Sequence, residues 1–144
     1  MDIIVVLNAG SSSIKFSLFG VAGDDLHLEC RGQIEGIYTA PHFVAKDQDG
    51  RVLAEQRWDE GHNLGHQGAL AHLQTFLRQQ QDGRKLIGIG HRVVHGGPNY
   101  ATPLRMNPDL LQALEAFVPL APLHQPHNLA PIRLLLQSSP DVPQ

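Results

Sequence analysis

Two apolar runs separated by a turn of small polar residues open the chain, and this feature constrains the fold most. Residues 3–7 form a continuous run rich in β-branched side chains, which is typical of a strand covered on both faces. Residues 8–13 (Asn-Ala-Gly-Ser-Ser-Ser) supply turn chemistry, and apolar and polar residues alternate over 14–19. We therefore expect an amino-terminal β-hairpin whose second strand has one polar face.

The remainder of the first half is predicted to be antiparallel and rich in hairpins. Strands are expected near residues 26–34, 42–46 and 51–58. The last two are joined by Asp49-Gly50, which favours a two-residue hairpin turn.

The second half changes to a helical period. Apolar residues from Leu64 to Leu77 predict an amphipathic helix that ends before Asp82-Gly83. A buried strand is expected over 86–95, and further helices are expected to start at residue 107 and to span about 128–137. Hairpins followed by alternating helices and a strand indicate an α/β domain with a mixed sheet and flanking helices.

Size and charge exclude several classes of protein. The 144 residues suffice for one core, so we expect one domain over 1–137 and a flexible, proline-containing tail over 138–144. The net charge of −3 argues against nucleic acid as a partner, and no apolar run is long enough to span a membrane. The lone Cys30 and the absence of a signal sequence predict a soluble protein of the cytoplasm.

The first candidate site is the turn between the two opening strands. Gly10 permits close approach of a ligand to the backbone, while Ser11, Ser12 and Ser13 offer hydroxyl donors and Lys15 a positive charge. Asn8, at the end of the first strand, could hold a metal-bound water or a phosphate oxygen. The pattern is not a Walker P-loop, because no Gly-Lys-Ser/Thr ending precedes a helix. On the residues alone, it fits a phosphate-binding turn or a plain Gly-Ser hairpin.

The second candidate site is the segment 90–97 (Gly-His-Arg-Val-Val-His-Gly-Gly). Strand alternation places Arg92 and Val94 on one face together with Gly88 and Gly90. A guanidinium beside a small apolar floor suits a short carboxylate or an acyl phosphate. The alternative is an arginine in a structural ion pair.

The third candidate site is the loop 121–124 (Ala-Pro-Leu-His), which presents His124 just ahead of a predicted helix. A histidine there can donate a hydrogen bond to an anionic oxygen, and a capping or core role is the alternative. His62 and His66 have the spacing of a zinc pair, as do His91 and His95, but neither pair carries the glutamate of His-Glu-x-x-His. No zinc site is therefore expected.

Taken together, residues 8–15, 90–97 and 121–124 resemble the acetokinase family of acetate, propionate and butyrate kinases, within the sugar kinase, Hsp70 and actin superfamily. The resemblance covers the chain from residue 1 to about 137. It implies a ribonuclease H-like, actin-like ATPase domain and reversible, Mg²⁺-dependent phosphoryl transfer from ATP to acetate, which gives acetyl phosphate and ADP.

The resemblance also implies a role for each candidate residue. Asn8 would assist Mg²⁺, and the nucleotide phosphates would be lined by Ser11, Ser12, Ser13 and Lys15. Arg92 would hold the carboxylate or the transferring phosphoryl group, Val94 and Leu123 would flank the acetate methyl group, and His124 would lie near the transition state. Positioning and charge neutralisation dominate such transfers, so cationic and amide donors are the expected tools.

Departures from the family pattern affect what can be expected. Gln125 stands where asparagine is common and Pro98 where a polar residue is common, so propionate or butyrate remains an alternative acceptor. Family members continue into a Phe-Asp-Thr-Ala-Phe-His segment and a second domain that also carries the dimer contacts, and neither occurs in these residues. We expect residues 1–144 alone to be inactive. A non-catalytic module that binds nucleotides or anions is the alternative from another class.

Overall fold

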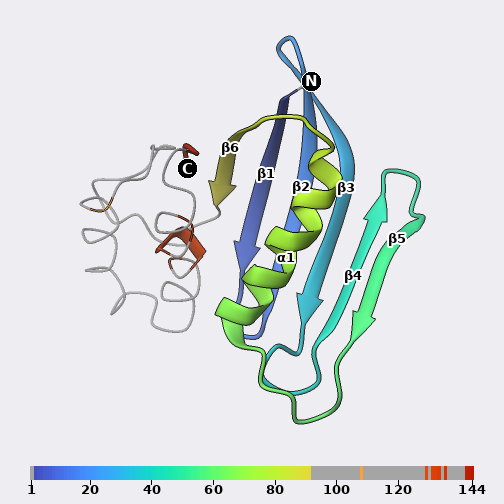
Figure 1. Ribbon diagram of the computed structural model, residues 1–144, viewed down its shortest axis with the longest axis vertical. Coiled ribbons are helices and arrows are strands. Elements are labelled where there is room, and N and C mark those ends of the chain that lie inside the picture. The colour runs from blue at the N-terminus through green and yellow to red at the C-terminus, as the bar shows by residue number, and fades with distance from the viewer. Residues whose placement is uncertain (1, 92–107, 109–128, 130, 134, 136–141) are drawn as a thin grey trace.

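A six-stranded sheet organises the part of the chain that the structure describes (Figure 1). The computed structural model describes residues 2–91, 108, 129, 131–133, 135 and 142–144. Its elements are β1 (Asp2–Ala9), β2 (Ser13–Ala22), β3 (Asp25–Glu35), β4 (His42–Asp47), β5 (Val52–Arg57), α1 (Gly65–Gln81) and β6 (Leu86–His91). The strand order is β5-β4-β3-β2-β1-β6, and only the pairing of β1 with β6 is parallel. The predicted mixed sheet with an antiparallel first half is confirmed.

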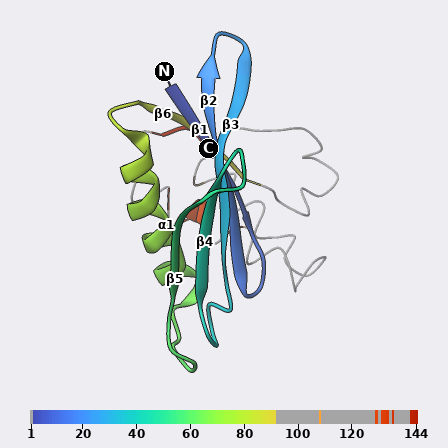
Figure 2. The same ribbon diagram turned by 90° about the vertical axis from the view of Figure 1, so that its right-hand side faces the viewer.

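Helix α1 lies against one face of the sheet (Figure 2), which we call the helix face. Alternate residues of the strands point into this layer, and α1 adds an apolar stripe of its own. The buried side chains of the layer include Ile3, Val5, Leu7, Ile14, Phe16, Leu18, Ile34, Phe43, Ala69, Leu70, Leu73 and Phe76. The other face of the sheet carries Asn8, Ser13, Lys15, Ser17 and Gln33, and we call it the polar face.

The expectation that β1 is covered on both faces is wrong. Its burial alternates, so that Ile3, Val5 and Leu7 are buried while Val6 on the polar face is 38% exposed. The β-branched run reflects strand propensity and pairing on both edges, by β2 and by β6, while α1 covers only the helix face.

The hairpin between β4 and β5 differs from the predicted two-residue turn. Asp47 N donates to Arg51 O (2.9 Å) and Gly50 N donates to Asp47 O (3.1 Å), so three residues form the loop. Gly50 adopts a positive φ of 85°, which glycine permits at little cost. The Asp47 carboxylate accepts from the backbone amides of Asp49 and Arg51, both at 2.9 Å, and these bonds favour the longer loop.

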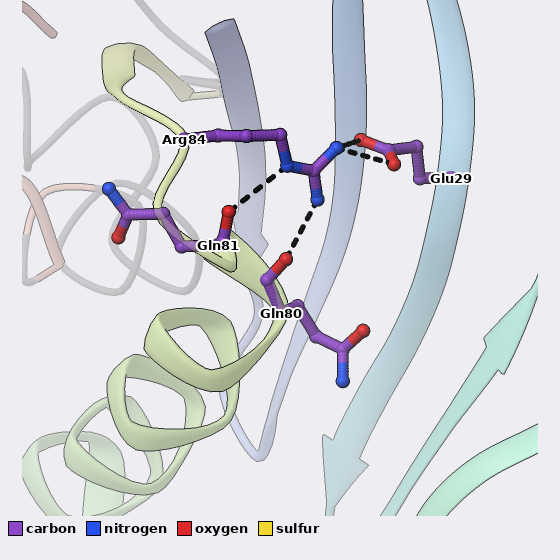
Figure 3. Close-up of polar contacts among 4 residues, drawn as sticks. All are labelled: Glu29, Gln80, Gln81 and Arg84. Atoms are coloured by element: carbon purple, nitrogen blue, oxygen red, sulfur yellow. Dashed lines mark hydrogen bonds and ion pairs between the residues drawn. The ribbon is translucent and has the colours of Figure 1, made fainter. Parts of the chain in front are cut away.

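Helix α1 ends where the sequence predicts, and its last turn is attached to β3 (Figure 3). Asp82 takes a left-handed conformation and stops the helix. Arg84 then donates to the backbone carbonyls of Gln80 (2.7 Å) and Gln81 (3.0 Å) and to both carboxylate oxygens of Glu29. This arginine satisfies terminal helix carbonyls and joins the helix to the sheet.

Among the described residues beyond β6, Leu135 belongs to the same buried layer. Leu129, Ile132 and Leu135 lie in helical backbone and are buried, within the helix predicted over 128–137. Val142 packs against the core, and Pro143 O accepts a hydrogen bond of 2.8 Å from Ile89 N at the edge of β6. The end of the chain therefore contacts the sheet. Within the described residues, no helix is long and apolar enough to cross a membrane.

Candidate functional site

The turn between β1 and β2 is tight and exposes its tip. Ala9 and Ile14 form the last register pair, and Gly10 N donates to Ser13 O at 2.8 Å. Ser11 and Ser12 at the tip are exposed, whereas Ser13 is half-buried. The turn thus exposes two serines at its tip, and turns of this kind bind anions through hydroxyls and backbone amides.

Asn8 and Lys15 lie directly opposite each other on the polar face. Gln33 of β3 is the register partner of Lys15 on its other side, so amide, ammonium and amide groups form a row across three strands. Asn8 and Gln33 are half-buried and Lys15 is exposed. Sequence reasoning missed Gln33, because only the pairing of β2 with β3 brings it to this row.

More cations lie on the same face. Arg31, the partner of Ser17, is opposite Lys46 of β4, and both side chains are exposed. With Lys15 they place three cationic side chains on this face, which also carries the carboxylates of Glu35 and Glu55. Exposed cationic groups attract anionic ligands.

The structure does not describe the other predicted site residues. Arg92, Val94, Leu123 and His124 lie outside the described residues, as do Pro98 and Gln125. The strand that leads to Arg92 is described as far as His91. There Gly90 lies beside Val6 on the polar face. A Cβ added to Gly90 would lie 3.5 Å from a methyl carbon of Val6.

His91, the last residue of β6, is a half-buried histidine. Its Nε2 donates to the Gln144 side-chain oxygen at 2.6 Å, and among the described residues its Nδ1 has no hydrogen-bond partner. Burial lowers the pKa of His91 to about 4, and the hydrogen bond to Gln144 opposes this change. The side chain is therefore neutral at physiological pH.

His66 contacts the turn directly, which sequence reasoning did not detect. Its Nε2 lies 2.7 Å from Gly10 O and its Nδ1 lies 2.7 Å from the Tyr38 hydroxyl. Both nitrogens are thus engaged by protein atoms. Among the described residues, no three His, Cys, Asp or Glu side chains gather as metal ligands.

A cavity of about 300 Å³ lies on the opposite side of the sheet from Lys15. It is partly open to solvent and lies between α1, β1 and β6, and its walls are mainly apolar, with Leu73, Leu77, Val5 and Ile89 among them. This cavity belongs to the helix face, so it is separate from the row of Asn8, Lys15 and Gln33.

Comparison with known proteins gives concordant matches. A family model described as the Acetokinase family matches residues 3–144. Two proteins named acetate kinase are 44% identical (Rhizobium meliloti, over 144 residues) and 41% identical (Nitrobacter hamburgensis, over 145 residues), and each match covers 100% of this chain. The chain spans 36% of the length of both relatives.

Solved structures agree with these matches. The crystal structure of a propionate kinase from Francisella tularensis subsp. tularensis SCHU S4 superposes with a TM-score of 0.83 at 33% identity, over 100% of this chain and 36% of that one. An acetate kinase of Porphyromonas gingivalis gives a TM-score of 0.77 at 24% identity, again over 100% of this chain and 36% of that one, a likeness of fold alone.

Proposed function

Because the chain belongs to the acetokinase family, we propose that the protein transfers the γ-phosphoryl group of ATP to acetate, reversibly, giving acetyl phosphate and ADP. The fold is that of the actin-like ATPases. The observation that carries the proposal is the match over residues 3–144 together with the register pair of Asn8 and Lys15 beside an exposed serine turn.

In this proposal the polar face receives the nucleotide phosphates. The Lys15 ammonium and the exposed donors of Ser11 and Ser12 neutralise and orient phosphate oxygens, and Ser13 lines the same turn. Asn8 supplies a carboxamide oxygen toward Mg²⁺, an oxygen ligand of the kind that this ion prefers. When bound, the ion offsets charge on the transferring phosphoryl group.

The acceptor half of the proposal depends on the family motifs. Arg92 grips carboxylate or phosphoryl oxygens, Val94 and Leu123 enclose the acyl chain, and His124 donates to the group in transfer. Gly90, two residues before Arg92 in the sequence, adds no side chain of its own to the polar face. The chain spans 36% of the length of these relatives.

Acetyl phosphate formation by the full-length gene product, with ATP, Mg²⁺ and acetate, tests the proposal. The Arg92→Lys variant keeps the charge and loses the two-pronged grip, so we expect kcat/KM to fall about 100-fold. The control is Arg57→Lys, whose side chain is 72% exposed on β5, and we expect it to be as active as the parent. Residues 1–144 alone are expected to show no turnover. Full-length protein that binds ATP but never forms acetyl phosphate would instead be a non-catalytic nucleotide-binding module.

Propionate is a second acceptor to test, because the structure matched at 33% identity is a propionate kinase. Rates with acetate, propionate and butyrate, compared as kcat/KM in the same assay, decide the assignment. A pocket preference for one methylene is worth about 10- to 200-fold. A preference of that size for propionate would replace acetate in the proposal.

A further inference from the structure

Three chain segments meet at the end of the sheet that carries the turn. Ile37, in the loop after β3, donates its N–H to Ser12 O (3.3 Å) and accepts from the amides of Leu64 (2.9 Å) and Gly65 (2.8 Å) at the start of α1. Its side chain is fully buried. The turn, the β3–β4 loop and the helix start are therefore joined through one residue.

His66 closes this set of contacts from α1 back to the turn. Its side chain is buried, with the residue 9% exposed. Because Gly10 O is solely an acceptor, Nε2 carries the hydrogen and donates to it at 2.7 Å. In the neutral imidazole, Nδ1 then accepts the Tyr38 hydroxyl hydrogen at 2.7 Å.

The bond to Gly10 O has a geometric consequence for the next residue. The carbonyl of Gly10 and the N–H of Ser11 belong to one planar trans peptide, so they point in opposite directions. Drawing the oxygen toward buried His66 directs the Ser11 N–H away from the interior, at the exposed tip of the turn. Gly10 N is held as well, by Ser13 O, so a residue of high intrinsic backbone freedom is restrained on both sides.

We propose that His66, oriented by Tyr38, is a positioning residue that holds the Ser11 amide toward the nucleotide phosphates. This inference rests on the phosphate-binding role proposed above. Preorganised backbone donors accelerate transfer because they need no reorganisation as charge develops. This role differs from that of a histidine that only packs in the core, because the group that His66 orients is an amide at the exposed tip of the turn.

Three variants and one control test this role in the full-length protein. His66→Leu removes both hydrogen bonds, while His66→Gln offers an amide nitrogen to Gly10 O and an amide oxygen to the Tyr38 hydroxyl. Tyr38→Phe removes only the second bond. The control, His72→Leu, changes a histidine on the same helix whose ring packs on Phe43 (4.6 Å) and Trp58 (5.0 Å) instead.

The first measurement is amide hydrogen exchange at Gly10 by NMR, and the second is the KM for MgATP against the KM for acetate. We expect His66→Leu to speed exchange and to raise the KM for MgATP, each about tenfold, as for loss of one buried hydrogen bond. The KM for acetate stays unchanged. His66→Gln restores most of both values, and Tyr38→Phe shifts them in the same direction by less.

The outcomes separate this inference from the kinase proposal. Unchanged Gly10 exchange in His66→Leu, or the same rise in the KM for MgATP in His72→Leu, overturns the positioning role. If His66→Leu does not fold, Tyr38→Phe decides by the same two measurements. A parent protein without any ATP turnover refutes the kinase proposal. In that case MgATP is titrated while the NMR signal of the Ser11 amide is followed, and weaker MgATP binding by His66→Leu than by the parent still supports the positioning role.

Discussion

The helix face and the polar face of the sheet are built from alternate residues of the same strands, yet their contents differ. In β2, Ile14, Phe16 and Leu18 are at most 3% exposed, while Lys15 between them is exposed and Ser17 is half-buried. The helix face buries large apolar side chains under α1. The polar face carries the amide, hydroxyl and ammonium groups that a phosphate ligand needs.

This difference separates stability from chemistry along a single strand. Burial of apolar area provides most of the folding free energy, so substitutions on the helix face should lower the free energy of unfolding. Substitutions on the polar face should leave it folded and change what it binds. Four experiments test this division, in order of expected effect.

The largest effect is expected from Phe16→Ala. Phe16 is 3% exposed and packs on the rings of Phe43 (6.4 Å between centroids) and Phe76 (5.8 Å). Its truncation should lower the free energy of unfolding by about 3–5 kcal/mol, measured by urea denaturation. Ser17→Ala, one residue along on the polar face, should change it by less than about 0.5 kcal/mol. Equal losses for both variants would contradict the division.

The second experiment uses His91, a titratable residue two positions after the buried Ile89 on β6. Its pKa is lowered from 6.5 to about 4 in the folded protein, so the unfolded chain binds the proton more tightly. The stabilisation is therefore fully present above about pH 6.5 and is lost as the pH falls toward 4, by roughly 2–3 kcal/mol.

Urea denaturation between pH 7 and 4 checks this dependence against His91→Gln. The variant should show a shallower loss of stability over the same range, because glutamine does not titrate. Burial also lowers the pKa of His72, and that contribution, of the same sign, remains in both proteins. Parallel curves would show that protonation of His91 does not destabilise the fold.

The third experiment compares two strand glycines. A Cβ on Gly32 would lie 2.3 Å from Val44 O and 2.8 Å from the Phe16 ring, whereas one on Gly90 would meet Val6 at an ordinary 3.5 Å. Gly32→Ala should therefore cost about 1–3 kcal/mol through overpacking. Gly90→Ala should leave thermal stability nearly unchanged, while under the proposed function the added methyl group on the polar face should raise the KM for acetate. A strongly destabilised Gly90→Ala would assign that glycine to packing.

The smallest effect on free energy is expected from Lys15→Met. Loss of one charged contact to phosphate should raise the KM for MgATP about tenfold, with melting temperature unchanged because Lys15 is exposed. Lys46→Met, on the polar face of β4, removes the same charge two strands away and should change the KM far less. Equal effects of the two variants on the KM would mean that the total positive charge of the polar face, and not a direct contact from Lys15, attracts MgATP.

Local pattern was sufficient for most elements of the first 91 residues. Alternation over 14–19 and the helical period from Leu64 to Leu77 predict β2 and α1 correctly, because burial on one side of each element leaves a periodic trace. The two-residue turn at Asp49-Gly50 was wrong, since the Asp47 side chain favours a three-residue loop. Nothing in the β1 run revealed that Val6 is exposed, because propensity does not report which layer covers a strand.

The candidate site was predictable only in part. The composition of residues 8–15 predicts a turn, and the structure has one there. The motifs at Arg92 and His124 lie outside the described residues, so their roles stay predictions. Gln33 and His66 carry no local signal, because each gains its meaning from a contact with a distant segment.

The sequence by itself determined the strand and helix periods, the turn chemistry of residues 8–13 and the family to which the chain belongs. The tertiary structure decided which face of the sheet is polar, that Gln33 completes the row with Asn8 and Lys15, and that His66 holds Gly10 across 56 positions of the chain. The physical reason is the distance along the chain over which each interaction acts. Periodicity and turn propensity act over a few neighbouring residues, whereas the orientation of one peptide at Gly10 depends on hydrogen bonds that exist only after α1 has packed against the sheet.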